Sequence, residues 1–289
     1  MPIRITLTGD LGSGKSTVAK ELHSAYGLSL FSTGAIQRGI AVEKGMTTFE
    51  LNKYAETHPE IDARIDGELA ALSDRDEDMA IDSRMGWHFV RGTFRVFLTA
   101  DETVAAGRVA GDARGPAETY ESIEDTILSL RGRKASENFR YAEKYGVDCF
   151  DMNNYDCVVD TTAITPEQAA AHIMAQYEAW QGGKESPRLW LSRYCLYPVA
   201  SEGGGAASAG RIGAVLVGGR YFLYEGHDLA AARILGGEDL LPCALLAQDA
   251  GALPDGRSAR DFVRGAFDLG AARAWAARCG FEFFSFPDV

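Results

Sequence analysis

The 289-residue sequence has no apolar run approaching the roughly 18 residues that a membrane-spanning helix requires. Its five cysteines are scattered, odd in number and without a C-x-x-C pair, which argues against a disulfide framework or a zinc knuckle. The five histidines show no metal-ligand spacing. Basic residues number 29 against 41 acidic ones, and the net charge of −12 disfavours polyanionic partners such as nucleic acid or an acidic membrane face.

The N-terminus also lacks the charged, apolar and small-residue regions of a signal peptide, because a short strand runs directly into a glycine loop. We therefore expect a soluble, cytoplasmic protein without a membrane or nucleic-acid partner. The oligomeric state is left open by the sequence.

The length favours two domains, and the first half alternates apolar strand patterns with helical ones. This alternation predicts an α/β fold with a doubly wound parallel sheet. The expected strands are Arg4–Thr8, Leu28–Ser32, Met79–Asp82, Phe94–Thr99 and Cys157–Asp160, and the clearest helices are Ser16–Tyr26 and Pro166–Trp180. The polar stretch Gln181–Pro187 is typical of a linker, and 201–210 of a flexible loop.

A phosphate-binding motif, G-x-x-x-x-G-K-S, runs from Gly9 to Ser16 between the first predicted strand and helix. Glycines let backbone N–H groups surround phosphate oxygens, Lys15 neutralises the outer phosphates, and the Ser16 hydroxyl can ligate Mg²⁺. The motif predicts a site for ATP and Mg²⁺. Its nucleotide-binding residues are Gly9, Gly12, Ser13, Gly14, Lys15, Ser16 and Thr17. The side chain of Asp10 is expected to point away from bound phosphate.

Phosphoryl transfer between two anions requires basic residues on the acceptor side and on a closing lid. Arg38 and Arg84 suit the acceptor phosphate, with Ser32, Thr33 and Gly34 beside them. Asp82 ends a predicted strand and can reach Mg²⁺ through water. The predicted catalytic residues are Lys15, Asp82, Arg131, Arg133 and Arg140, of which the three arginines would close over the transferring group.

Over about residues 3–175 the chain resembles the short, archaeal type of cytidylate kinase. The similar segments are Phe31–Arg38, Gly45–Asp62, Ile81–Arg84 and Glu137–Asp148. The resemblance implies a P-loop nucleoside monophosphate kinase fold and ATP-dependent phosphorylation of a nucleotide acceptor, CMP or dCMP. It often shows Glu where this chain has Asp82.

The remainder, over about 188–250, resembles the ParB and sulfiredoxin-like domains, which implies a smaller α+β domain. Glu225, Gly226 and His227 match that pattern, whereas Leu229 replaces its nucleotide-binding arginine and the turn has no cysteine. The expected domains are 1–182 and 188–289, the second ending in two helical pieces around Gly270. A fragment ending near Pro187 is expected to fold and to retain the chemistry.

Two other functions stay open: a P-loop kinase acting on another small molecule, and a non-catalytic nucleotide-sensing protein. The intact Lys15, Ser16 and Asp82 favour catalysis over sensing. Whether the C-terminal part binds a ligand or regulates the kinase is not decided by the residues.

Overall fold

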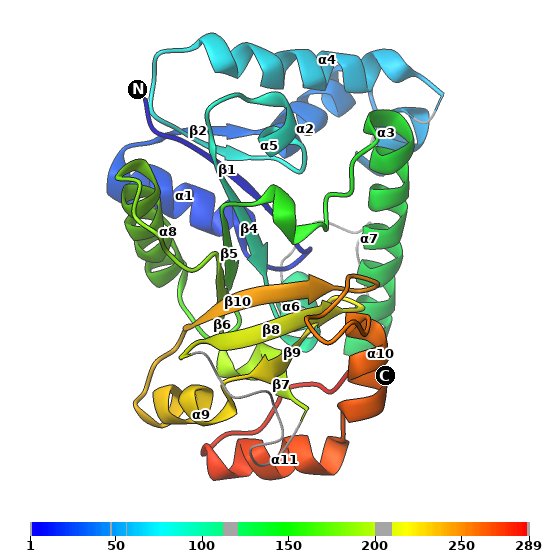
Figure 1. The fold of residues 1–289 in the computed structure, drawn as a ribbon. Helices are drawn as coiled ribbons and strands as arrows, with labels where there is room; N and C mark the ends of the chain where they lie inside the picture. The colour runs from blue at the N-terminus through cyan, green and yellow to red at the C-terminus, as the bar shows by residue number, and fades with distance from the viewer. Residues whose placement is uncertain (1, 47, 56, 112–120, 200–209, 288–289) are drawn as a thin grey trace.

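The fold is organised around one mixed ten-stranded sheet (Figure 1). This computed structural model describes residues 2–46, 48–55, 57–111, 121–199 and 210–287. The strand order is β2-β3-β1-β4-β5-β6-β10-β8-β9-β7. The strands are β1 (Arg4–Gly9), β2 (Ser29–Ser32), β3 (Met79–Asp82), β4 (Phe94–Thr99), β5 (Cys157–Asp160), β6 (Leu189–Leu191), β7 (Leu196–Pro198), β8 (Ile212–Val217), β9 (Arg220–Glu225) and β10 (Leu241–Gln248).

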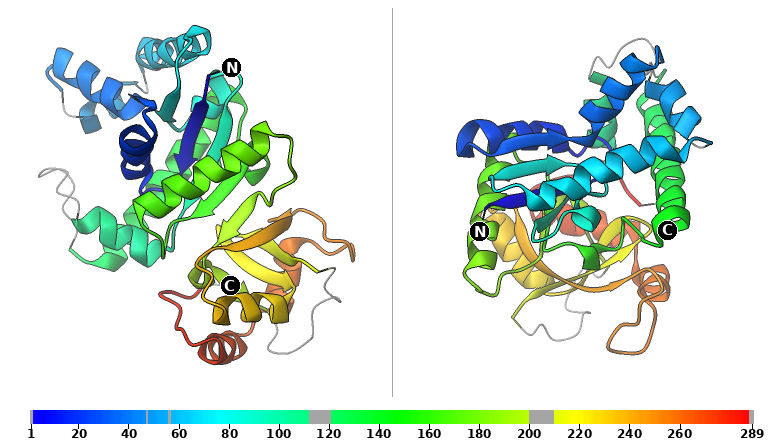
Figure 2. Two further views of the ribbon diagram at one scale, coloured as in Figure 1. Left: turned by 90° about the vertical axis from the view of Figure 1, so that its left-hand side faces the viewer. Right: turned by 90° about the horizontal axis from the view of Figure 1, so that it is seen from above.

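Helices connect the strands and cover the sheet (Figure 2). They are α1 (Lys15–Tyr26), α2 (Thr33–Glu43), α3 (Thr48–Ala55), α4 (Pro59–Ala71), α5 (Gly86–Phe89), α6 (Glu102–Gly111), α7 (Ile123–Tyr145), α8 (Pro166–Gln181), α9 (His227–Leu235), α10 (Ala259–Ala266) and α11 (Leu269–Arg278). None of the helices in the described part of the chain has the length and apolar character to cross a bilayer.

Strands β1 to β5 pair in parallel, which confirms the predicted α/β class of the first part. Alternation along β3 shows why both faces are buried: Ala80 packs in the cluster with α1 and α8, whereas Met79 and Ile81 pack with α2, α3 and α4. The carboxyl ends of β1 and β3 therefore meet at one edge, where a ligand binds in sheets of this type.

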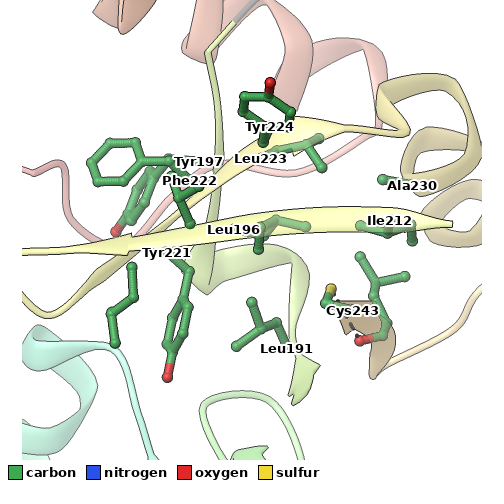
Figure 3. Close-up of a cluster of buried hydrophobic side chains, with 14 of the residues drawn as sticks. Leu191, Leu196, Tyr197, Ile212, Tyr221, Phe222, Leu223, Tyr224, Ala230 and Cys243 are labelled. Atoms are coloured by element: carbon green, nitrogen blue, oxygen red, sulfur yellow. Dashed lines mark hydrogen bonds between the residues drawn. The ribbon is translucent and has the colours of Figure 1, made fainter. Parts of the chain in front are cut away.

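The sheet continues across the predicted domain boundary. Strand β6 pairs in parallel with β5, through Val158 and Leu189, and antiparallel with β10. One apolar cluster joins Phe97 and Tyr155 of the first part to Leu191, Leu223 and other side chains of the second. Figure 3 shows the side chains that the second part contributes to this cluster, Leu191 and Leu223 among them. The polar stretch after α8 is a connection as predicted, but it does not separate two cores.

This shared core changes the expectation for a fragment ending near Pro187. Such a fragment would leave the outer edge of β5 unpaired and would expose apolar side chains that β6 and β8 now cover. The boundary between 182 and 188 stays a prediction. The independence of the first part is no longer expected.

In the C-terminal part, β9, α9 and β10 follow the predicted order of strand, turn, helix and strand. The break between the last two helices was predicted at Gly270 and lies instead at Phe267 and Asp268. The Asp268 carboxylate accepts the Ala271 N–H at 2.6 Å, so Gly270 falls inside the first turn of α11. Apart from Gly210, the predicted loop at 201–210 lies outside the described residues.

Candidate active site

The phosphate loop connects β1 to α1, as the motif predicts. Gly9 and Gly12 both adopt positive φ, and both approach neighbouring backbone closely. A Cβ on Gly9 would lie 2.1 Å from the Leu98 carbonyl oxygen, and one on Gly12 would lie 2.5 Å from that of Ala105. Glycine is therefore required at these two positions by the space available, as well as by the conformation.

The Lys15 amine lies over this loop. Its Nζ donates to the carbonyl oxygens of Gly9 at 2.9 Å and of Asp10 at 2.7 Å. Burial, followed by the Arg84 charge, lowers the pKa of Lys15 to about 7, against the opposing effect of nearby carboxylates. A phosphate group beside this amine would favour its charged form.

Ser16 and Asp82 come together from α1 and β3. The Ser16 hydroxyl donates to Oδ2 of Asp82 at 2.7 Å, because β1 and β3 pair in register at Leu7 and Asp82. A hydroxyl and a carboxylate are the hard oxygen donors that Mg²⁺ prefers. No group of three or more His, Cys, Asp or Glu side chains suited to a metal occurs among the described residues. The pair fits an ion that takes most of its ligands from water and substrate phosphates.

The predicted acceptor residues gather beside this pair. Ser32 lies opposite Asp82 in the β2–β3 register, and the Thr33 hydroxyl donates to the Asp82 carbonyl oxygen at 3.5 Å. Arg38 is exposed one turn further along α2, with its Nη1 3.4 Å from where a Cβ on Gly34 would stand. The structure therefore brings the predicted acceptor segment next to the Ser16–Asp82 pair.

Arg84 lies between the phosphate loop and helix α7. Its Nη1 donates to the Gly9 carbonyl oxygen, and its Nε lies 2.9 Å from a Glu137 carboxylate oxygen on α7. Burial opposes the charge of Arg84, but Glu137 and other neighbours outweigh burial and raise the pKa. Arg84 thus links the phosphate loop to helix α7.

The three predicted lid arginines all lie on α7. Arg131 forms an ion pair with Glu102 at 2.7 Å, and Arg133 is half-buried. The Cζ atom of Arg140 lies 5.4 Å from the ring centroid of Tyr141. Their closure over a transferring group stays a prediction.

Two basic residues that the sequence interpretation missed contact the phosphate loop. Lys134 on α7 pairs with Oδ1 of Asp10 at 2.7 Å, and Thr99 donates to the other carboxylate oxygen at 2.9 Å. Arg108 on α6 donates to the carbonyl oxygens of Gly12 at 3.4 Å and Thr161 at 2.8 Å. No local sequence signal distinguishes Lys134 from the other basic residues of α7, so the tertiary contact with Asp10 identifies it.

Comparison with known proteins agrees with this geometry. A family model described as an AAA domain matches residues 5–129. The cytidylate kinase of Thermoplasma volcanium is 35% identical over 176 residues, which is 60% of this chain and 90% of that protein. The chain belongs to the cytidylate kinase family. Another cytidylate kinase, from Methanothermobacter thermautotrophicus, is 34% identical over 56% of this chain and 98% of its own length.

Other matches extend beyond cytidylate kinases. An S-adenosylmethionine-dependent nucleotide dehydratase from Lacinutrix mariniflava is 32% identical over 62% of this chain, but only 36% of that protein is matched. Among solved structures, a shikimate kinase from Acinetobacter baumannii covers 63% of this chain and 96% of its own, with 16% identity and a TM-score of 0.44. The cytidylate kinase match leaves about two fifths of the chain outside it.

Proposed function

We propose that this protein transfers a phosphoryl group from ATP to a nucleoside monophosphate, CMP or dCMP, giving the diphosphate and ADP. The observation that carries the proposal is the meeting of the phosphate loop, the Ser16–Asp82 pair and Arg84 at one edge of the sheet. Membership of the cytidylate kinase family supports the choice of a pyrimidine nucleotide as acceptor.

The protein's own groups divide into donor and acceptor sides. On the donor side, backbone N–H groups of the loop and the Lys15 amine would hold the outer phosphates of ATP. On the acceptor side, Arg38 is accessible on α2, and Ser32 and Thr33 offer hydroxyls next to Asp82. Arg84, already bonded to Gly9, would keep the two phosphates at a fixed separation and offset their repulsion.

Mg²⁺ is proposed at Ser16 and Asp82, where it would neutralise charge on the phosphates when bound. Closure of α7 with Arg131, Arg133 and Arg140 would exclude water and so suppress ATP hydrolysis. We also propose that residues 188–250 are related to the ParB and sulfiredoxin-like domains. The proposed location of the whole protein is the cytoplasm.

The test is a screen for ADP release with CMP, dCMP, UMP, AMP and serine as acceptors. We expect CMP or dCMP to give the highest kcat/KM, and Lys15→Ala to lose more than about 100-fold in turnover. The matched control is Lys20→Ala, which removes an exposed lysine from the same helix. Turnover with serine alone would identify a kinase of another small molecule, and ATP binding without any turnover would identify a sensor.

Arg38 provides a second test that separates the two phosphate sites. Arg38→Ala is expected to raise the KM for the acceptor at least about tenfold while an ATP analogue binds as to the wild type. Its control is Arg64→Ala, because Arg64 is an exposed arginine paired with Glu43 at 2.8 Å on the same region of the surface. Equal losses of ATP affinity and acceptor affinity in Arg38→Ala would assign it to the donor site.

A further inference from the structure

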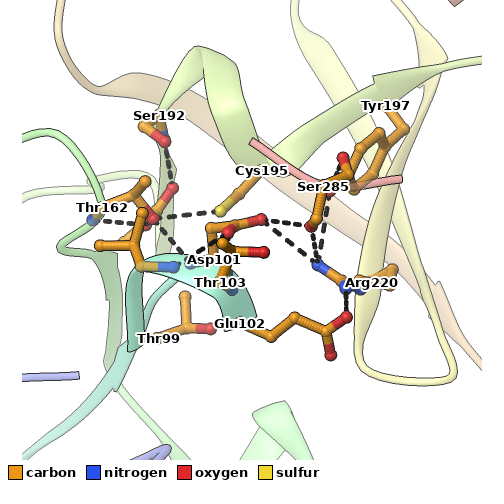
Figure 4. Close-up of polar contacts among 12 residues, drawn as sticks. Thr99, Asp101, Glu102, Thr103, Thr162, Ser192, Cys195, Tyr197, Arg220 and Ser285 are labelled. Carbon is orange, nitrogen blue, oxygen red and sulfur yellow. Dashed lines mark hydrogen bonds and ion pairs between the residues drawn. The ribbon is translucent and has the colours of Figure 1, made fainter. Parts of the chain in front are cut away.

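Arg220, the first residue of β9, reaches from the C-terminal part to the start of α6. Its side chain is only 13% exposed. Its Nη1 lies 3.5 Å from a carboxylate oxygen of Asp101 and 3.1 Å from the Ser285 hydroxyl, and its Nη2 forms an ion pair with Glu102 (Figure 4). A buried guanidinium thus joins segments that lie far apart in the sequence.

Asp101, whose carboxylate Arg220 contacts, immediately precedes α6 and caps its N-terminus. One of its oxygens accepts the N–H groups of Thr103 at 2.9 Å and Val104 at 3.2 Å, and the other accepts the Ser285 hydroxyl at 2.6 Å. Asp101 is completely buried. Its charge is stabilised by the helix N-terminus on one side and by Arg220 on the other, so loss of Arg220 would leave a buried carboxylate with weaker compensation.

Helix α6 in turn supports the phosphate loop. The loop packs so closely on it that the Gly12 Cα faces the Ala105 carbonyl, and Arg108 donates to the Gly12 carbonyl oxygen at 3.4 Å. Thr99, just before α6, donates to Asp10. A displacement of the first turn of α6 would therefore move the backbone that surrounds phosphate.

Glu102 extends the same contact to α7. The Glu102 carboxylate forms ion pairs with Arg220 and with Arg131, the latter at 2.7 Å. One turn further along α7, Lys134 pairs with Asp10. Arg220 consequently contacts a residue that holds α7, in addition to the residue that begins α6. Both helices touch the phosphate loop.

We propose that Arg220 is a positioning residue for the ATP site, and that the β8–β9 hairpin fixes α6 and α7 against the phosphate loop. The proposal rests on the proposed function only in placing ATP at that loop. It assigns the C-terminal part a role in the donor half of the reaction. Arg220 touches no reacting atom and acts through Asp101 and Glu102.

The experiment uses the full chain and the variants Arg220→Gln, Arg220→Lys and Arg233→Gln. Arg233 is the matched control, because it pairs with Glu238 at 2.8 Å on the surface of the same C-terminal part. The dissociation constant of a non-hydrolysable ATP analogue is measured by calorimetry at a temperature at which every variant is folded. The KM values for ATP and CMP are measured beside it.

Arg220→Gln is expected to weaken the ATP analogue about tenfold or more and to raise the KM for ATP in parallel, with the KM for CMP changed less than about twofold. Arg220→Lys should recover part of the loss because it retains the charge, and Arg233→Gln should bind as the wild type does. If Arg220→Gln does not fold, Ser285→Ala removes one bond from Asp101 and should give a smaller loss of the same kind.

Three results would overturn the proposal: analogue binding within about twofold of the wild type in Arg220→Gln, equal increases in both KM values, or no recovery in Arg220→Lys. The binding measurement needs no acceptor. A failure to phosphorylate CMP would therefore reject the proposed acceptor and leave the test of Arg220 intact.

Discussion

The Lys134–Asp10 pair gives the sharpest prediction, because it links helix α7 directly to the phosphate loop. The two groups lie 2.7 Å apart, with the lysine side chain 36% exposed and the aspartate 20% exposed. Lys134 also lies 4.2 Å from the ring centroid of Phe150. Lys134→Met removes the charge while keeping most of the apolar stem.

The stability lost in Lys134→Met lies between two limits. Breaking a fully buried ion pair costs about 3–5 kcal/mol, and breaking an exposed one costs about 1 kcal/mol or less. Asp10 keeps the Thr99 hydrogen bond at 2.9 Å, and the partial exposure of the pair lets water reach the carboxylate. We therefore expect Lys134→Met to lower the free energy of unfolding by about 1–2 kcal/mol.

The same substitution changes the pKa of Asp10 in the phosphate loop. Burial tends to raise the pKa of Asp10, but Lys134 and then Thr99 outweigh burial and hold the pKa below its ordinary value. Removal of Lys134 leaves burial with less opposition, so the pKa of Asp10 rises in the variant. The protonated form would then be populated at a higher pH.

The assay is urea unfolding of the wild type, Lys134→Met, Asp10→Asn and the double variant. We expect a coupling energy of about 1–2 kcal/mol, with the double variant more stable than the sum of the single losses implies. The control is Arg91→Met, whose partner Asp74 lies 3.2 Å away with both side chains about four-fifths exposed, and it should change stability by less than about 0.5 kcal/mol. Additivity of the two single effects would refute the reasoning.

Four further outcomes are expected. Asp82→Asn should raise the Mg²⁺ concentration for half-maximal turnover by about 10–100-fold, as titration of the metal would show. Gly12→Ala and Gly14→Ala each cost about 1 kcal/mol in conformation, but only Gly12 meets backbone, so urea unfolding should show a distinctly larger loss for Gly12→Ala. Burial lowers the pKa of His172 from 6.5 to about 4, so the native state binds fewer protons than the unfolded state between these pH values. Stability should fall by about 2.5 kcal/mol from pH 6.5 to pH 4, and His172→Gln should remove that part of the pH dependence. A fragment ending at Pro187 should melt well below the full chain or aggregate, and a soluble fragment with the melting temperature of the full chain would contradict the shared core.

The first five strands and the phosphate loop were predictable from the sequence because their signals are local. Met79–Asp82, Phe94–Thr99 and Cys157–Asp160 coincide with the predicted strands, and each is a short apolar run in a βαβ unit. The Ser16–Asp82 contact follows from the same pattern. In a parallel sheet the ends of β1 and β3 lie at the same edge, so a motif after one strand meets a carboxylate that ends the other.

The continuation of the sheet was not predictable because it depends on non-local pairing. Strand β6 has only three residues, and Leu189 gives no sign of whether its partner will be β5 or a strand of the second part. Lys134 was missed for a related reason. It sits among several basic residues on α7, and only the direction of that helix decides which of them reaches Asp10.

Asp10 itself shows how tertiary contacts change the interpretation of a motif. An acidic residue inside a phosphate loop is unfavourable for anion binding if its charge is uncompensated. The sequence analysis predicts that the Asp10 side chain points away from phosphate. In the structure its carboxylate pairs with Lys134 and accepts a hydrogen bond from Thr99. The same contact makes the loop depend on α7, which the motif alone does not indicate.

The shared sheet also has a consequence for the order of events during synthesis. Strands β1 to β5 emerge from the ribosome first, and β6 follows at once to cover the edge of β5. The partner of β6 on its other side, β10, begins about 50 residues later, a delay of roughly 3–10 s at typical rates of translation. During that interval the nascent chain presents the open edge of β6, and Phe97 and Tyr155 lack the cluster partners that β8 and β10 supply later. The risk of misassembly is therefore concentrated in the time between β6 and β10, and slower translation of that segment would prolong it.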